Sequence, residues 1–310
     1  MRIVLFGQAA FGQQVLTGLL DSGHEVAAVY APPPAGGKED PLAAVASQRG
    51  VPLQIPKSYR TPEVAAQVRA LDADLGVLAF VTKIIPEEVI SAPKSGTICF
   101  HPSLLPRYRG GSALAWQLIQ GEERGGFTVF WTDAGIDTGP ILLQREIPIG
   151  PDDTAGSLYF DKIFAPGVAG MVEAVGLVAA GKAPRIVQDE ARATYDPLCT
   201  DDHAAISWDE PARRIYDLIR GCDPQPGAHT TFGGDRLRLF GAKRLPGSTG
   251  GVAPGAVLEV GADGIVVAAG SGSEAGRIAI TKVRGSGGKV AAGEFAAASG
   301  LAAGARLGAA

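Results

Sequence analysis

The sequence contains few of the residues that build metal centres and disulfide frameworks. Among 310 residues it has three cysteines and two methionines, and Cys99, Cys199 and Cys222 are widely separated. Structural zinc sites and disulfide-stapled folds need closely spaced or paired cysteines. The sequence therefore predicts no metal site and no disulfide framework, and a reducing, cytoplasmic location is expected.

Long apolar runs and a strong excess of one charge are also missing. No run of about 18 apolar residues occurs, as a transmembrane helix would need, and the apolar start Ile3–Phe6 is too short for a signal peptide. The net charge is only −4, so the whole chain has no general attraction for nucleic acid or membranes. We therefore expect no membrane partner.

Motifs for nucleotide cofactors are missing as well. The turn at residues 7–12 reads GQAAFG, which lacks the G-x-G-x-x-G spacing of dinucleotide-binding folds, and no acidic residue closes the next apolar run at Tyr30. There is no G-x-x-x-x-G-K-[ST] loop and no G-x-S-x-G motif. The sequence gives no support for bound NAD, NADP or ATP.

The sequence does contain a regular alternation of strand and helix patterns over residues 1–185. The continuous apolar run Ile3–Phe6 is typical of a strand covered on both faces. Helical spacing follows it at Phe11, Val15 and Leu19. The repeated alternation predicts an α/β fold with a Rossmann-like, mostly parallel sheet and helices on both faces.

The pattern changes near residues 185–205. Short β runs broken by glycines follow, which is typical of a small, OB-like β-barrel. We therefore predict two domains, 1–204 and 205–310. The second carries a net charge of +3 against −7 for the first, a weak indication of an anionic partner. The Ala/Gly-rich tail, 291–310, is expected to be loosely held.

A histidine stands at the end of one predicted strand. Cys99 and His101 are two positions apart, so both side chains point to the same face of that strand. Pro102 follows at once and should end the strand. Ligand crevices in open α/β sheets lie at the carboxyl ends of the strands, which makes His101 a candidate for acid–base chemistry. A buried, hydrogen-bonded histidine is the structural alternative.

A carboxylate in a glycine-rich loop is the second candidate group. Asp137 lies in the segment 133–139 (DAGIDTG), whose glycines allow the backbone to approach a ligand closely. Asp133 qualifies by the same reasoning, and the sequence does not separate the two. Aspartates in such loops also serve simply to form the turn. Paired with His101, this loop predicts a general acid–base site for a carbonyl substrate.

The segment 101–111 (HPSLLPRYRGG), followed by 135–139 (GIDTG), resembles the folate-dependent formyltransferase family. Within the family the similarity is greatest to the hydrolase domain that begins 10-formyltetrahydrofolate dehydrogenase. Further similar segments are 6–13, 37–42, 112–116, 126–131, 151–154, 181–185, 193–195 and 206–208. The resemblance is good over 1–245. It implies a cytoplasmic enzyme of one-carbon metabolism that uses 10-formyltetrahydrofolate as substrate or formyl donor, without metal or NADP.

The resemblance also assigns roles by matching positions. His101 corresponds to the family's catalytic histidine and Asp137 to its essential aspartate. Transferases of the family carry Asn where this chain has Cys99, and the hydrolase domain carries an aliphatic residue there, so Cys99 favours hydrolysis over transfer to an amine. Two segments match the lining of the folate pocket; they contain Lys83, Ile84, Ile85, Ser103, Leu104, Leu105 and Pro106.

The implied chemistry is attack of a nucleophile on the N10-formyl carbonyl. His101 would donate a hydrogen bond to the oxyanion, and Asp137 would orient His101 and accept a proton from the nucleophile. Cys99 is a weak donor in place of Asn, which predicts a slow enzyme or one whose attacking water is arranged differently. A formylated Cys99 is a further alternative. With water as nucleophile, the products are formate and tetrahydrofolate.

Two other functions stay open from the sequence. One is formyl transfer to an amine, with methionyl-tRNA ahead of a nucleotide sugar, and the other is a folate-binding protein with residual activity. The mildly basic second domain is compatible with tRNA. However, the loop 32–40 holds one Lys and no Arg, which makes tRNA the less favoured acceptor.

Overall fold

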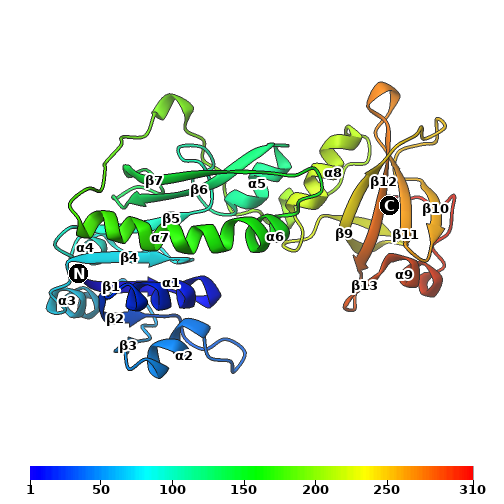
Figure 1. Cartoon of the computed structure of the whole chain (residues 1–310). Coiled ribbons are helices and arrows are strands. Elements are labelled where there is room, and N and C mark those ends of the chain that lie inside the picture. Colours follow the sequence, from blue (N-terminus) through cyan, green and yellow to red (C-terminus); the bar gives the residue numbers. More distant parts are fainter. Residues whose placement is uncertain (310) are drawn as a thin grey trace. The chain divides into compact units, whose positions relative to one another are not determined.

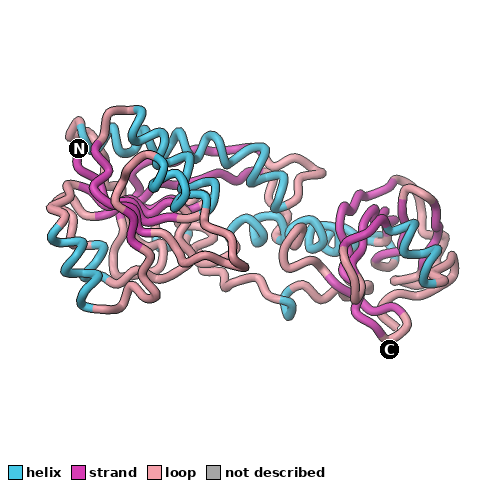
Figure 2. The backbone as a smooth tube through the Cα atoms, turned by 90° about the horizontal axis from the view of Figure 1, so that it is seen from below, coloured by secondary structure: helices cyan, strands magenta, loops and turns pink. Residues whose placement is uncertain are grey.

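The computed structural model describes residues 1–309, which form two compact units (Figure 1). The first unit contains Met1–Gly110, Gly126–Ile147 and Phe160–Tyr195. The second contains Gly111–Gly125, Pro148–Tyr159 and the chain from Asp196 onward. Figure 2 shows the strands gathered into two separate sheets, one in each unit.

A seven-stranded sheet forms the centre of the first unit, in the order β3-β2-β1-β4-β5-β6-β7. Strand β1 pairs in parallel with β2 and β4, and β4 pairs in parallel with β5, whereas β5 and β6 run antiparallel. The strands are β1 (Arg2–Gly7), β2 (Glu25–Tyr30), β3 (Leu53–Gln54), β4 (Leu75–Ala79), β5 (Thr97–His101), β6 (Arg124–Trp131) and β7 (Ile141–Pro148). The predicted mostly parallel sheet is thereby confirmed.

Helices cover both faces of this sheet, as predicted. They are α1 (Ala9–Asp21), α2 (Pro41–Gln48), α3 (Pro62–Ala70), α4 (Glu87–Ile90) and α7 (Phe164–Ala179). Helices α1 and α7 contact each other, and Phe11 of α1 packs on Phe100 of β5 with ring centroids 4.4 Å apart. On the other face, residues of α3 and α4 join a buried cluster with Phe6 and Tyr30.

Asp40 fixes the starts of two helices at once. Its carboxylate accepts hydrogen bonds from the backbone N–H of Leu42, in the first turn of α2, and of Ala9, the first residue of α1. A carboxylate at a helix start satisfies N–H groups that have no partner within the helix. The loop that precedes α2 is therefore tied to the carboxyl end of β1.

Helix α7 ends a continuous helical stretch, Ala155–Ala179, that is long and apolar enough to cross a membrane by length and composition alone. The sequence shows no unbroken apolar run here, because residues such as Gly156, Pro166 and Glu173 interrupt it. In the structure, α7 packs tightly on the sheet. A Cβ atom on Gly167 would lie 2.7 Å from the ring of Phe100, and one on Gly170 would lie 2.6 Å from the ring of Phe127. The helix is thus one layer of the α/β fold.

The second unit is built on a smaller, antiparallel sheet in the order β10-β11-β12-β9-β8, with β13 beside β12. This finding confirms a separate β structure in the C-terminal part of the chain. Its strands are β8 (His229–Phe232), β9 (Asp235–Leu245), β10 (Val257–Gly261), β11 (Gly264–Ala269), β12 (Gly276–Arg284) and β13 (Lys289–Ala291). The remaining helices are α5 (Ala113–Ile119), α6 (Ala155–Ser157), α8 (Ala212–Gly221) and α9 (Ala292–Ser299), with a π-helical turn, η1 (Leu158–Ile163), after α6.

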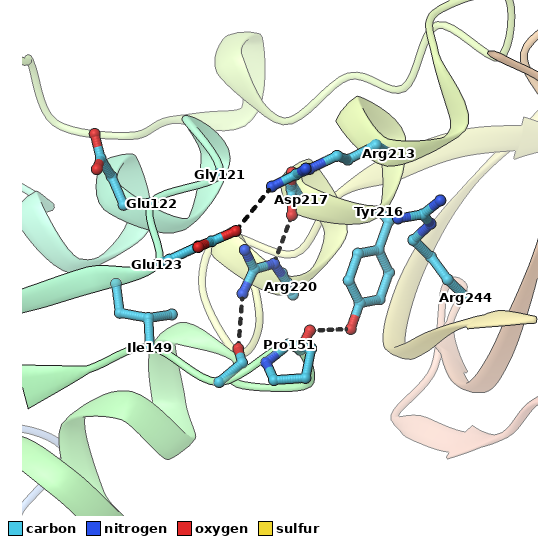
Figure 3. A pocket seen from close by; sticks show the side chains of 11 residues that line it. Gly121, Glu122, Glu123, Ile149, Pro151, Arg213, Tyr216, Asp217, Arg220 and Arg244 are labelled. Carbon is cyan, nitrogen blue, oxygen red and sulfur yellow. Dashed lines mark hydrogen bonds and ion pairs between the residues drawn. The ribbon is translucent and has the colours of Figure 1, made fainter.

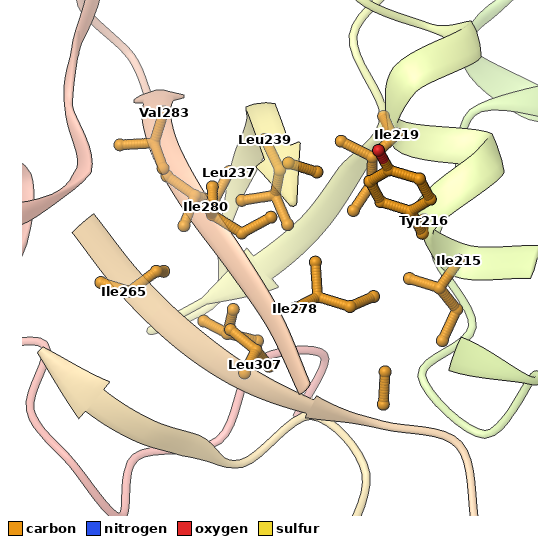
Figure 4. Close-up of a cluster of buried hydrophobic side chains, with 14 of the residues drawn as sticks. Ile215, Tyr216, Ile219, Leu237, Leu239, Ile265, Ile278, Ile280, Val283 and Leu307 are labelled. Carbon is orange, nitrogen blue, oxygen red and sulfur yellow. The ribbon is translucent and has the colours of Figure 1, made fainter. Parts of the chain in front are cut away.

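The C-terminal tail is packed, and the expectation that it is loosely held was wrong. Ala292 and Ala296 of α9 and the later Leu301 and Leu307 are almost fully buried. They join the apolar core of the second unit together with α8 and the β-strands, part of which Figure 4 shows. Small residues let α9 lie close to the sheet, so an Ala/Gly-rich composition here reflects tight packing.

Candidate active site

His101 is the last residue of β5, at the carboxyl edge of the sheet. Its neighbour Phe100 points to the opposite face and anchors the strand between Phe11 and Phe127. His101 is buried, with 5% of the residue exposed. Its Nε2 atom lies 2.7 Å from the carbonyl oxygen of Tyr108. The strand and the following loop thus hold the ring from two sides.

Asp137 faces the same imidazole. Its Oδ2 atom lies 3.5 Å from His101 Nδ1, and the backbone N–H of Gly110 donates a hydrogen bond of 2.8 Å to the same Oδ2. The side chains of His101 and Asp137 are 7% and 17% exposed, so little water screens the pair. Asp137 has a backbone φ of 56°, in the left-handed region. The structure brings together the two groups that lie 36 positions apart in the sequence.

The structure separates Asp137 from Asp133, the other candidate in the loop. The Oδ1 atom of Asp133 accepts hydrogen bonds from the N–H of Gly135 and from Thr138 Oγ1, at 3.0 and 2.6 Å. Asp133 therefore forms the turn. A Cβ atom on Gly135 would lie 2.0 Å from Thr138 Oγ1, so this turn requires glycine.

The two contacts of the imidazole constrain its protons. A carbonyl oxygen only accepts hydrogen bonds, so the Nε2 atom of His101 must carry a hydrogen to bond Tyr108. The other ring nitrogen, Nδ1, does not contact Tyr108 and faces the Asp137 carboxylate.

Cys99 lies on β5 two residues before His101 and is partly buried. Its thiol donates to the carbonyl oxygen of Phe100 at 3.5 Å. Burial, followed by the negative charge of Asp137, raises the pKa of the Cys99 thiol. Because the thiolate is the nucleophilic form of cysteine, this environment disfavours Cys99 as the attacking group.

The loop after His101 is held by side chains from β6 and β7. Thr128 Oγ1 donates to the carbonyl oxygen of Ser103 at 2.7 Å, and Gln144 Nε2 donates to that of Leu105 at 2.9 Å. Ser103 itself is fully buried and donates to the carbonyl oxygen of Arg107. Leu105 and Pro106 are buried as well, and Leu104 is partly exposed. These contacts fix the shape of the loop.

The second predicted folate-lining segment follows β4. Lys83 and Ile84 are exposed, whereas Ile85 is buried under α4. Ile84 is 66% exposed, so its apolar side chain is accessible to a ligand. Lys83 also lines a small pocket with Gln8 and Tyr59. The structure thus places this segment at the carboxyl edge of the sheet, as it does His101.

Two further side chains that hold the site were not found from the sequence. Arg109 is 6% exposed and binds Gln188, and Gln188 in turn binds the backbone of the Asp137 loop. Arg109 and Gln188 are 79 positions apart, so no local sequence pattern connects them. The signal for Arg109 was its place in the motif at residues 101–111, whereas nothing in the sequence singled out Gln188.

A pocket in the second unit contains none of the predicted site residues (Figure 3). It has a volume of about 490 Å³. Arg220 in its wall donates to Asp217 at 2.7 Å, and Tyr216 donates to the carbonyl oxygen of Pro151 at 2.6 Å. Among residues 1–309 no cluster of three or more His, Cys, Asp or Glu side chains suited to a metal ion was found.

The fold agrees with comparisons to known proteins. The formyl transferase family model matches residues 1–175, and the model for the C-terminal domain of formyl transferases matches residues 199–299. The chain therefore belongs to the formyl transferase family, as its resemblance implied.

Individual relatives include two kinds of enzyme. The cytosolic 10-formyltetrahydrofolate dehydrogenase of Xenopus tropicalis is 48% identical over 265 residues, which is 84% of this chain but 29% of that protein. Methionyl-tRNA formyltransferase of Moorella thermoacetica is 38% identical over 296 residues, covering 94% of this chain and 93% of that protein. The chain thus spans under a third of the length of the dehydrogenase.

A solved structure shows the same fold. HypX from Aquifex aeolicus, in complex with tetrahydrofolic acid, aligns with a TM-score of 0.68 over 96% of this chain and 47% of that one. The two sequences are 22% identical over this alignment. This similarity shows that the chain shares its fold with that part of HypX.

Proposed function

We propose that this protein hydrolyses 10-formyltetrahydrofolate to tetrahydrofolate and formate. The observation that carries the proposal is the approach of His101 Nδ1 to the Asp137 carboxylate at 3.5 Å, beside a Cys99 that is held as a neutral thiol. The 48% identity to the corresponding region of a 10-formyltetrahydrofolate dehydrogenase supports the same substrate. The exposed Ile84 would contact the flat ring system of the folate.

The groups would act on the formyl carbonyl as an acid–base pair. Asp137 accepts a proton from water as the water oxygen bonds to the formyl carbon. The protonated Nδ1 of His101 first stabilises the developing oxyanion and then gives its proton to N10 as the C–N10 bond breaks.

The thiol of Cys99 is a weak hydrogen-bond donor, and this affects whether water or an amine receives the formyl group. A thiol stabilises an oxyanion less well than an amide N–H, and loss of one oxyanion donor typically costs about 10²–10³ in rate. We therefore propose a slow hydrolase. The three free cysteines also support the proposal that the protein works in the reducing cytoplasm.

Formyl transfer to an amine is the second candidate. Its support is the 38% identity to a methionyl-tRNA formyltransferase, which extends over nearly the whole of both chains, including the mildly basic C-terminal region. Against it, the loop 32–40 offers a single lysine to the phosphates of tRNA.

The experiment is a formate-release assay of the purified protein with 10-formyltetrahydrofolate, with and without methionyl initiator tRNA. Release without an acceptor supports hydrolysis, whereas turnover only with tRNA supports transfer. Tight tetrahydrofolate binding without any turnover would identify a folate-binding protein. His101→Ala and Asp137→Ala should each lower the rate by about 10²–10⁴ while folate still binds.

A matched control is available in the same loop. Asp133→Asn keeps the oxygen that accepts from Gly135 and Thr138, and Asp133 does not face His101. This variant should retain the wild-type rate. If Asp133→Asn were as inactive as Asp137→Ala, the loss would reflect the loop fold, and the proposed role of the Asp137 carboxylate would be wrong.

A further inference from the structure

The loop that carries Asp137 is held by one buried amide. Gln188 is 5% exposed, and its Nε2 atom donates to the carbonyl oxygens of Asp137 and Gly139 at 2.8 and 2.7 Å. Both hydrogens of the amide are therefore used on the Asp137 loop. Because Asp137 has a left-handed φ of 56°, a conformation that costs energy in residues other than glycine, the loop needs such external support.

Arg109 fixes the direction in which that amide points. Its Nε and Nη2 atoms both donate to Gln188 Oε1, at 3.1 and 2.8 Å. A guanidinium carries only donors and a carbonyl oxygen only accepts. The amide of Gln188 therefore has a single orientation that satisfies both sides, and a flipped amide would set hydrogens against hydrogens.

Glu190 in turn holds Arg109. Its two carboxylate oxygens accept from Arg109 Nη1 and Nη2 at 3.0 and 2.6 Å, and this hydrogen bonding raises the pKa of the arginine. The paired, planar geometry uses the fixed fork of the guanidinium. Glu190 itself is largely exposed, so the Arg109–Glu190 ion pair forms the solvent-facing end of the network.

The backbone around Arg109 contacts both proposed catalytic groups. The carbonyl oxygen of Tyr108 accepts from His101 Nε2, and the N–H of Gly110 donates to Asp137 Oδ2. The N–H groups of Tyr108 and Arg109 donate to Thr194, one to its hydroxyl and one to its carbonyl. Three consecutive residues, 108–110, therefore reach His101, Gln188 and Asp137.

We propose that Arg109 and Gln188 are positioning residues that set the Asp137 carboxylate against the His101 ring. Neither touches the reacting atoms; both act through the backbone of the Asp137 loop. The proposal rests on the proposed catalytic role of Asp137. Misplacement of a catalytic group by about 1 Å can cost a hundredfold in rate, so removal of these donors should lower kcat and leave KM nearly unchanged.

The first test is Gln188→Met, which keeps the side-chain length and burial but removes both donors. Its kcat for formate release should fall ten- to a hundredfold, with KM changed less than threefold. In the Asp137→Asn background the same change should have less than a twofold effect, because there is no carboxylate left to place. Equal losses in both backgrounds, or a wild-type kcat for Gln188→Met alone, would overturn the proposal.

Two further variants separate positioning from stability. Arg109→Lys keeps the charge but loses the fork, and should lower kcat in the same direction as Gln188→Met. Arg185→Met removes an arginine from the neighbouring segment, where it lies 3.7 Å over the ring of Trp131, and should leave kcat unchanged. If Arg185→Met lowers kcat as much as Arg109→Lys, the effect is one of general stability and the proposal is wrong.

A measurement that does not depend on activity distinguishes the hydrolase proposal from the positioning proposal. The amide resonance of Gly110 reports its hydrogen bond to Asp137 Oδ2 in two-dimensional NMR. It should shift in Gln188→Met and in Asp137→Asn, but not in Arg185→Met. If the wild-type protein releases no formate while this pattern holds, the hydrolase proposal fails and the positioning network stands; an unshifted resonance in Gln188→Met overturns the network.

Discussion

The Nε2 atom of His101 lies 2.7 Å from the carbonyl oxygen of Tyr108, and this contact leaves Nδ1 as the ring nitrogen that faces Asp137. Nε2 keeps its hydrogen in every protonation state that preserves the bond. The acid–base chemistry that we propose for this site would therefore involve the Nδ1 side of the ring.

The neutral form of His101 is predicted to be the Nε2–H tautomer. In 15N–1H NMR spectra of the imidazole rings, its Nδ1 should show the shift of an unprotonated nitrogen once the ring is neutral. His229, whose Nε2 lies 3.0 Å from the carbonyl oxygen of Asp201, serves as an internal reference with the same expected tautomer. An Nδ1–H signal from neutral His101 would contradict the geometry.

Cys99 is predicted to be unreactive and dispensable for hydrolysis. Because burial and the charge of Asp137 raise its pKa, the thiol stays protonated at pH values near 8.5, where an ordinary cysteine ionises. Alkylation of Cys99 by iodoacetamide at pH 8.5 should be much slower in the folded protein than in urea. Cys99→Ala should keep most of the formate release.

Cys99→Asn tests the effect of a stronger hydrogen-bond donor at the same position. The amide would add a strong hydrogen-bond donor beside His101, so formyl transfer to an added amine should be preserved or raised, by as much as about 10²-fold if the oxyanion is bound there. The assay is formylated amine produced per formate released. A loss of folded structure in this variant would show that position 99 belongs to the core.

Two glycines of α7 offer a matched pair for stability. Gly167→Ala would place a methyl group 2.7 Å from Phe100, so it should lower the free energy of unfolding by about 1–3 kcal/mol. A Cβ atom on Gly176 meets open space, so Gly176→Ala should raise the free energy of unfolding by about 0.5–1 kcal/mol. Urea denaturation of both variants checks the pair. Equal effects would mean that α7 does not pack on the sheet as described.

Asp201 is predicted to make the second unit sensitive to acid. Arg238 binds both of its oxygens, at 2.7 and 2.8 Å, and lowers the pKa of Asp201 to about 2. The folded-state pKa is below the unfolded value of about 3.9, so this stabilisation is complete above pH 4 and is lost as the pH falls toward 2. Asp201→Asn should flatten the fall in Tm over that interval. Asp202→Asn, at an exposed neighbour, should not.

Local patterns predicted the elements of the fold well, because strand and helix signals extend over a few residues. The apolar run Ile3–Phe6, for example, lies within strand β1, Arg2–Gly7, as expected. The C-terminal tail was misjudged because its buried Leu301 and Leu307 are isolated among Ala and Gly, so no periodic pattern marks them.

The site was predicted only in part, because its contacts join distant segments. His101 followed from a strand end, but Asp133 and Asp137 share one local pattern, and only the three-dimensional contacts separate them. Gln188 lies in a segment without regular structure and shows its function only once Arg109 and the Asp137 loop surround it.

Tyr108, Arg109 and Gly110 are consecutive, so the distance along the chain between their three contacts is fixed. One carbonyl, one side chain and one N–H group from successive residues each meet a different partner. A single inserted or deleted residue would therefore shift all three at once. Side-chain exchange is restricted as well, because Tyr108 and Gly110 have φ values of 62° and 98°, in the region that favours glycine. For redesign of this enzyme, both the length and the backbone conformation of this loop are boundaries.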